Sequence, residues 1–284
     1  MDDRTELSEF LKSRRARLRP EDVGLRDYGG MRRVAGLRRE ELARLAGVSI
    51  AHYTRLEQGN GDSVSDEVLD AIGAALRLDA DELAYLHRIA RRPQPCAAAV
   101  AAPDVPLGLG YLLESFVMTP ALVIGPHTQI VAWNPLAVAV FGDFPVLPED
   151  RRTISHLLFT EPYLRLHPTG WEQAARGHVA HLRVLLGRYR GDSGLVAHLE
   201  HMRDLSADFA RMWAQHPVAQ VRDRAYLLHH PVVGELTLHG ELITLPEEPS
   251  CWGLDMFAAE PGSASEQALR KIGNLEAAFS DSDN

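Results

Sequence analysis

The chain is poor in cysteine and has no long apolar run. Its two cysteines, Cys96 and Cys251, are far apart in 284 residues and do not suggest a disulfide framework, which fits a reducing compartment. No apolar run reaches the roughly 18 residues that a membrane span requires, and no signal-peptide pattern opens the sequence. We therefore expect a cytoplasmic protein that makes no membrane contact.

Patterns of catalytic and metal sites are also missing. The pairs His178/His181 and His198/His201 have helical spacing, but no HExxH frame or neighbouring cysteine completes a zinc site. The segment 191–194 contains a serine, yet it lacks the preceding strand and the Gly-x-Ser-x-Gly spacing of a nucleophile turn. No glycine-rich phosphate loop occurs. The sequence predicts a protein without catalytic residues, metal or cofactor.

Basic charge is concentrated in one stretch, although the formal net charge of the chain is −9. Between Lys12 and Arg55 there are twelve basic residues against five acidic ones. Residues 1–92 carry seventeen of each sign, so the acidic excess belongs to the C-terminal part. Because phosphate attraction supplies most non-specific affinity for DNA, the stretch 12–55 favours a nucleic-acid partner.

Two short helices joined by a tight turn are predicted between Leu37 and Gly59. Gly47 accepts the left-handed backbone that ends a helix, and Ser49 is a good N-cap for the next helix. The spacing of apolar residues gives each helix one inward face. The inward positions are Leu42, Leu45 and Ala46 in the first helix and Tyr53 and Leu56 in the second. This pattern is a helix-turn-helix.

The segment resembles the XRE/Cro-like helix-turn-helix family. The matching words are Glu41-Leu42-Ala43, Leu45-Ala46-Gly47-Val48-Ser49 and Tyr53-x-Arg55-Leu56-Glu57-x-Gly59. Further helices are predicted at about Glu6–Leu18, at Val64–Leu78 with Ser65 as cap, and at Ala80–Ala90. Together these make the five-helix DNA-binding bundle that the resemblance implies.

Within the motif, Arg55 is the best candidate to read a base, because its guanidinium matches guanine O6 and N7. The alternative is an ion pair with Glu41 or Glu57. We interpret Glu57 as a structural residue that holds the end of the helix. The alternative for His52 and Thr54 is exposure without any contact, and the alternative for Arg32 and Arg33 is a solvated loop. The predicted DNA-binding residues are Arg32, Arg33, Arg38, Arg39, Ser49, Ile50, Ala51, His52, Thr54 and Arg55.

The chain has room for two domains. Prolines and small residues without an amphipathic pattern mark residues 93–106 as a linker. We expect a DNA-binding domain over 1–92, a second domain over 107–262 and a C-terminal tail over 263–284. In the second domain we predict strands at 121–125, 129–134, 225–230, 234–239, 241–245 and 252–258, and helices at 135–141, 154–159, 170–189, 194–204 and 207–216. These elements predict an α+β fold with an antiparallel sheet covered on one face.

Four short segments of this second domain resemble the MmyB-like ligand-binding domain, which is PAS-like. These segments are 120–125, 132–134, 230–238 and 259–263. The two resemblances together cover residues 5–275. They imply a one-component regulator with a pocket for a small apolar molecule such as a fatty acid.

The residues themselves say less about that pocket. Binding sites are usually apolar with a few polar anchors, and the aromatic residues of the domain are candidates for such a lining. The alternatives are an ordinary core for the aromatics and a helix N-cap for Asn134. The predicted ligand-binding residues are Phe116, Trp133, Asn134, Phe141, Phe209, Trp213 and Tyr226.

Two functional classes follow. The first is a transcriptional regulator that binds its operator as a homodimer, because one helix-turn-helix reads too few base pairs. The second is an XRE-like protein-interaction module whose second domain is a dimerisation or docking scaffold without a ligand. The basic stretch favours the first.

Overall fold

The computed structural model describes residues 3–25, 36–61, 64–91, 105–160, 168–189, 192–217, 224–244 and 252–282. The chain divides into two units. Unit 1 consists of Met1–Cys96 with Arg183–Asp192 and Ala214–Gln220, and unit 2 contains the remaining segments. The first break between the units follows Cys96, and two later segments group with the N-terminal residues.

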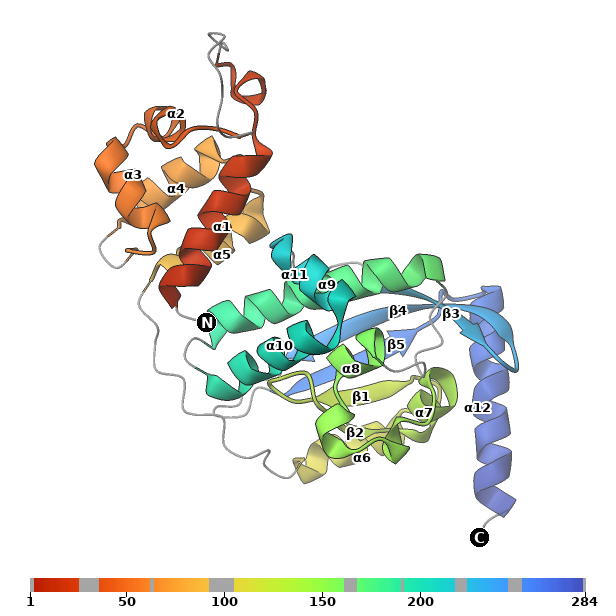
Figure 1. The fold of residues 1–284 in the computed structure, drawn as a ribbon. Coiled ribbons are helices and arrows are strands. Elements are labelled where there is room, and N and C mark those ends of the chain that lie inside the picture. The colour runs from red at the N-terminus through yellow and green to blue at the C-terminus, as the bar shows by residue number, and fades with distance from the viewer. Residues whose placement is uncertain are drawn as a thin grey trace. The chain divides into compact units, whose positions relative to one another are not determined.

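Unit 1 is a helical bundle (Figure 1). Two helices, α3 and α4, begin directly after the capping residues predicted for them. Ser49 accepts a hydrogen bond from the His52 amide at 3.1 Å, and Ser65 caps the fourth helix in the same way. The bounds are α1 Asp3–Arg17, η1 Glu21–Val23, α2 Arg39–Leu45, α3 Ile50–Glu57, α4 Asp66–Ala75 and α5 Ala80–Ala90.

The core of unit 1 confirms the inward positions of the motif, with one exception. Leu42, Tyr53 and Leu56 have no exposed surface, and Gly47 has the expected left-handed backbone with φ +67°. Leu45, which we expected inside, is 37% exposed. It is the last residue of α2 and lines a groove that is open to solvent.

Unit 2 is an α+β unit with one five-stranded antiparallel sheet of order β2-β1-β5-β4-β3. The strands are β1 Ala121–Ile124, β2 Ile130–Trp133, β3 Arg224–His230, β4 Gly234–Thr244 and β5 Gly253–Ala258. The helices and 3₁₀ turns are α6 Leu107–Ser115, α7 Pro135–Phe141, η2 Phe144–Val146, η3 Glu149–Arg151, α8 Ile154–Phe159, α9 Pro168–Arg188, α10 Ser193–Leu205, α11 Ala207–Ala214 and α12 Ala264–Ser282. Of these, the end of α9 from Arg183 and the last residue of α11, Ala214, group with unit 1.

Both faces of the sheet are buried at β1, which corrects the expectation of one covered face. Leu122 and Ile124 belong to the core shared with α7 and α12, whereas Ala121 and Val123 contact the core beneath α6. Successive residues of a strand point to opposite faces, so a strand that is buried throughout must have cover on both sides.

Two further expectations differ from the structure. Residues 234–239 and 241–245 were expected as separate strands, but Gly240 pairs with Arg224 and Phe257 inside one continuous β4. The segment 263–284, expected as a tail, forms α12. Its residues Leu269 and Ile272 are only 4% exposed because they pack into the core with α7 and the sheet.

Gly240 is required because two aromatic rings occupy the space above it. A Cβ atom there would lie 2.9 Å from Tyr226 Cε2 and 3.0 Å from Phe257 Cε1. We expect Gly240→Ala to lower the free energy of unfolding by about 1–3 kcal/mol, since overpacking forces rings from their positions. Urea unfolding followed by tryptophan fluorescence measures this.

Gly110→Ala in α6 is the matched control, because nothing lies within 4 Å of a Cβ at that position. Alanine favours helix over glycine by about 1 kcal/mol, so this variant should be as stable as the parent or more stable. Equal losses in the two variants would contradict the packing argument.

Candidate DNA interface and effector unit

The outer face of α3 carries the residues predicted to meet DNA. Ile50 is 54% exposed, and Ala51 and Arg55 are exposed as well. Thr54 and His52 are half-buried, and the Nε2 atom of His52 is buried with no hydrogen-bond partner among the described residues. The exposed face therefore centres on Ile50, Ala51 and Arg55.

Arg55 forms no ion pair within the described part of the chain. The two carboxylates named as alternatives have other partners: Glu41 accepts from the Arg38 amide at 2.7 Å, and Glu57 binds arginines of other helices. The guanidinium of Arg55 is thus available to a ligand.

Glu57 is a buried carboxylate that joins three helices. Its Oε1 accepts from Arg15 Nη2 of α1 at 2.7 Å, and its Oε2 accepts from Arg39 Nε of α2 at 3.2 Å. These guanidinium groups hold the pKa of Glu57 below its usual value despite burial, which acts in the opposite direction. The structural interpretation of Glu57 agrees with this geometry, whereas Arg15 was missed. Glu57 lies four residues after the inward Tyr53, and this spacing already places it on the buried face.

The remaining predicted DNA-binding residues lie beside this cluster. Arg38 precedes α2 with a side chain 44% exposed, and Arg39 is 48% exposed although its Nε is bound to Glu57. Ser49 is exposed and caps α3. Arg32 and Arg33 lie outside the described residues.

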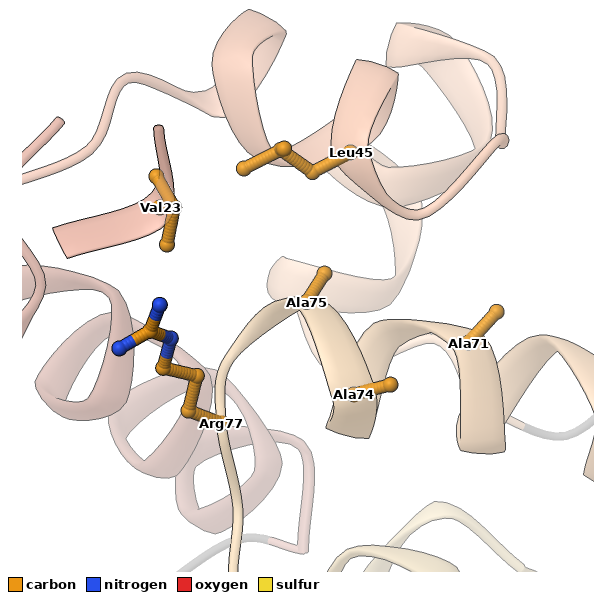
Figure 2. Close-up of a pocket in the computed structure, with 6 residues that line it drawn as sticks. All are labelled: Val23, Leu45, Ala71, Ala74, Ala75 and Arg77. Atoms are coloured by element: carbon orange, nitrogen blue, oxygen red, sulfur yellow. The ribbon is translucent and has the colours of Figure 1, made fainter. Parts of the chain in front are cut away.

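An open groove of about 410 Å³ lies on unit 1 (Figure 2). Leu45 and Val23 line one side, and small side chains of α4 line the other, with Arg77 at one end. This groove belongs to the DNA-binding unit, so it is not the effector pocket expected in the second domain.

The aromatic residues predicted as a pocket lining lie in separate places within unit 2. Phe141 contacts Phe257, with ring centroids 4.6 Å apart, and Phe257 also contacts Tyr226. Trp133 packs edge-on against Phe144 at 5.2 Å. The other positions are Phe116 in the core beneath α6, and Phe209 stacked on Trp213 in α11.

Asn134 has a structural role that uses its whole amide group. Its Oδ1 accepts from the amides of Ala121 at 3.1 Å and Ala137 at 3.0 Å. Its Nδ2 donates to the carbonyls of Phe116 and Thr119, both at 2.8 Å. Asn134 therefore caps α7 and ties β1 to the segment after α6.

Two buried polar groups in unit 2 were not predicted. Arg224 donates to both carboxylate oxygens of Asp255 at 2.8 Å and to the Tyr226 hydroxyl at 2.7 Å. Burial raises the pKa of Asp255 even beside this cation. A lone acid inside the apolar strand 253–258 is the pattern that indicates such a partner.

The second group is a serine between two histidines. Ser155 Oγ of α8 lies 2.9 Å from both His178 Nε2 of α9 and His198 Nε2 of α10. A hydroxyl has one proton, so Ser155 donates to one ring and accepts from the other. The described residues contain no group of three or more side chains that could hold a metal, and one histidine of each spaced pair, His178 and His198, binds Ser155.

Comparison with known families identifies both parts of the chain. Residues 6–86 match the model of a helix-turn-helix domain, and residues 105–272 match the MmyB-like transcription regulator ligand binding domain. These are regulatory DNA-binding and ligand-binding domains, in agreement with the prediction of a non-enzyme. Comparison with curated proteins gives no match. In the described part of the chain, no helix has the length and apolarity of a membrane span.

Replacing Glu57 with Gln tests the buried cluster. The variant removes the charge that Arg15 and Arg39 share, and breaking one side of a buried pair costs about 3 kcal/mol. We expect the midpoint of urea unfolding of unit 1 to fall accordingly. Glu40→Gln is the control, because that carboxylate is 60% exposed and should contribute less than about 0.5 kcal/mol. Equal midpoints for the two variants would refute the role of Glu57.

Acid should destabilise unit 2 through its histidines. Burial, together with neighbouring His156, His127 and His201, lowers the pKa of His198 from 6.5 to about 4, and burial beside Arg224 does the same for His181. The unfolded chain then binds more protons between these values, so the free energy of unfolding falls as pH drops from about 6.5 to about 4. Urea unfolding across this range measures the slope.

His198→Gln should reduce that pH slope, because glutamine keeps a polar side chain but cannot take up the proton. His229→Gln is the control, since His229 is exposed at the end of β3. An unchanged slope in His198→Gln would show that its imidazole is not the titrating group.

Proposed function

Since the chain belongs to the family of MmyB-like transcription regulators, we propose that it is a dimeric regulator whose operator binding responds to a small apolar effector. The observation that carries the DNA-binding part is the outer face of α3, on which Arg55 is exposed without an ion-pair partner among the described residues. A helix of this kind is held by the rest of the bundle so that its side chains enter the major groove.

Each residue of the interface takes the role that suits its chemistry. The planar fork of Arg55 reads guanine, and Ile50 and Ala51 lie against thymine methyl groups. Arg38 and Arg39 at the start of α2 bind phosphates, which position the protein without reading sequence. The supporting contacts come from Ser49, His52 and Thr54, and from Arg32 and Arg33 in the minor groove.

The protein acts as a homodimer. One recognition helix contacts too few base pairs for specific binding, so two copies occupy half-sites about 34–36 Å apart on one face of the DNA. The spacing between the two recognition helices then decides whether both half-sites are filled.

Unit 2 receives the effector, a fatty-acid-like molecule with an apolar body. Its interior offers aromatic surface around Phe141 and Tyr226, and its buried polar groups include the cation Arg224 and the imidazoles around Ser155. A ligand changes DNA affinity only by binding the two conformations of the dimer unequally.

Binding to DNA from the upstream region of the protein's own coding sequence tests the proposal. We expect tight binding that weakens as salt rises, and a loss of about tenfold or more for Arg55→Ala, because a bidentate base contact contributes about 1–3 kcal/mol. Fluorescence anisotropy across a salt series measures both effects.

Arg176→Ala is the matched control, because it removes an exposed arginine from unit 2. Binding that is lost equally in both variants would indicate non-specific attraction, and binding unaffected by Arg55→Ala would remove α3 as the reader. Saturated fatty acids of increasing chain length, added to the complex, test the effector by release of the DNA.

A further inference from the structure

The helix α6, labelled in Figure 1, carries exposed apolar side chains in addition to its buried ones. Its inner face is buried, with Leu109 5% and Leu113 4% exposed against β1 and β5. On the outside, Tyr111 is 68% exposed and Leu112 50%. A helix that is apolar on all sides is normally covered on all sides, so this second face lacks a partner.

Exposed apolar residues also follow the helix directly in the sequence. We call it the α6 face, and its members are Leu107, Tyr111, Leu112, Val117 and Met118. Of these, Leu107 is 78% exposed and Val117 72%. Five of the large apolar side chains that unit 2 exposes thus lie within twelve consecutive residues.

Almost no charge interrupts this region. From Val105 to Asn134 the sequence contains no Asp, Lys or Arg and a single Glu, Glu114, in a chain of which 24% of the residues are of these four types. The five residues of the α6 face carry no charge themselves, so the face offers nothing to bind a phosphate backbone. The matching surface must itself be apolar.

The area suits a pair of identical faces. From their exposed fractions, the five residues together present roughly 550 Å² to solvent, the upper range for an apolar patch on a monomer. Two such faces in contact would bury about 1,100 Å², close to the lower limit of a stable interface. Polar atoms around the rim add to this area.

The helix geometry permits two copies of α6 to approach closely. Gly108, Tyr111, Leu112 and Ser115 are spaced three, one and three residues apart, so they lie on one side of the helix. A Cβ on Gly108 would meet nothing within 4 Å. Small residues at both ends of this row leave grooves into which Tyr111 and Leu112 of a second copy fit.

We propose that the α6 face is the homodimer interface, with the α6 helices of two copies packed about a two-fold axis. A two-fold axis brings the same patch of both copies together, so one apolar surface completes itself. The choice of a second copy as occupant rests on the proposed function, because reading two half-sites requires a dimer.

Tyr111→Glu tests the interface in the full-length protein. The residue is exposed, so the substitution does not disturb the core of the monomer, and circular dichroism verifies this. We expect the parent to sediment as a dimer at micromolar concentration and Tyr111→Glu to raise the dimer dissociation constant at least tenfold.

Val232→Glu is the matched control, since Val232 is 54% exposed between β3 and β4, away in sequence from the α6 face. It should leave the dissociation constant unchanged. The proposal is overturned if the parent is a monomer at all concentrations, if Tyr111→Glu stays fully dimeric, or if both variants dissociate equally.

A cross-link gives a second readout that does not depend on weakening the dimer. In a chain with Cys96→Ser and Cys251→Ser, Leu112→Cys should form an intermolecular disulfide on mild oxidation, whereas Val232→Cys should not. Arg55→Ala separates failure of this interface from failure of the proposed function. If Arg55→Ala abolishes DNA binding while Tyr111→Glu remains dimeric, the proposed function stands and this interface is rejected.

Discussion

The buried carboxylate of Glu57 is the constraint on which the DNA-binding unit depends. An ion removed from water costs several kcal/mol unless it is paired and hydrogen-bonded, so Glu57 restricts where Arg15 and Arg39 can be. Arg15 belongs to α1 and Arg39 to α2, while Glu57 ends α3. One side chain therefore fixes three helices, and the outward direction of Arg55 follows because it lies two residues earlier on α3.

This arrangement changes what the basic charge of the stretch 12–55 means. Arg15 is committed to Glu57, and Arg14 is buried beside Glu82 at 2.8 Å, with its pKa lowered to about 10 by burial. These arginines stabilise the bundle and are not offered to phosphate. A count of basic residues thus overstates the surface available to DNA, and exposure decides which arginines contribute.

Local sequence patterns were sufficient to predict most of the helices and strands. The bounds of α5, α7 and α8 agree with prediction, because the caps Asp79, Asn134 and Thr153 and the apolar spacing lie in the same short segment. The prediction divided β4 into two strands at Gly240, because glycine is common in turns. Its actual role is to leave room for rings that come from β3 and β5. The arginines that pair with Asp255 and Glu57 are also distant from them in the sequence. The sequence can therefore indicate that each carboxylate is buried, but not which arginine pairs with it.

In the proposed dimer, the place of α6 in the chain would connect the interface to both proposed functions, DNA binding and effector binding. It is the first helix of unit 2, so a contact at the α6 face would set the distance between the starts of the two copies of unit 2. Its inner residues Leu109 and Leu113 pack on β1 and β5, the strands that also border the interior of unit 2. An effector that moved these strands would shift α6 within the dimer and alter the fit to two half-sites. Because packed cores transmit small displacements rather than absorb them, such a shift needs no contact between the effector and DNA.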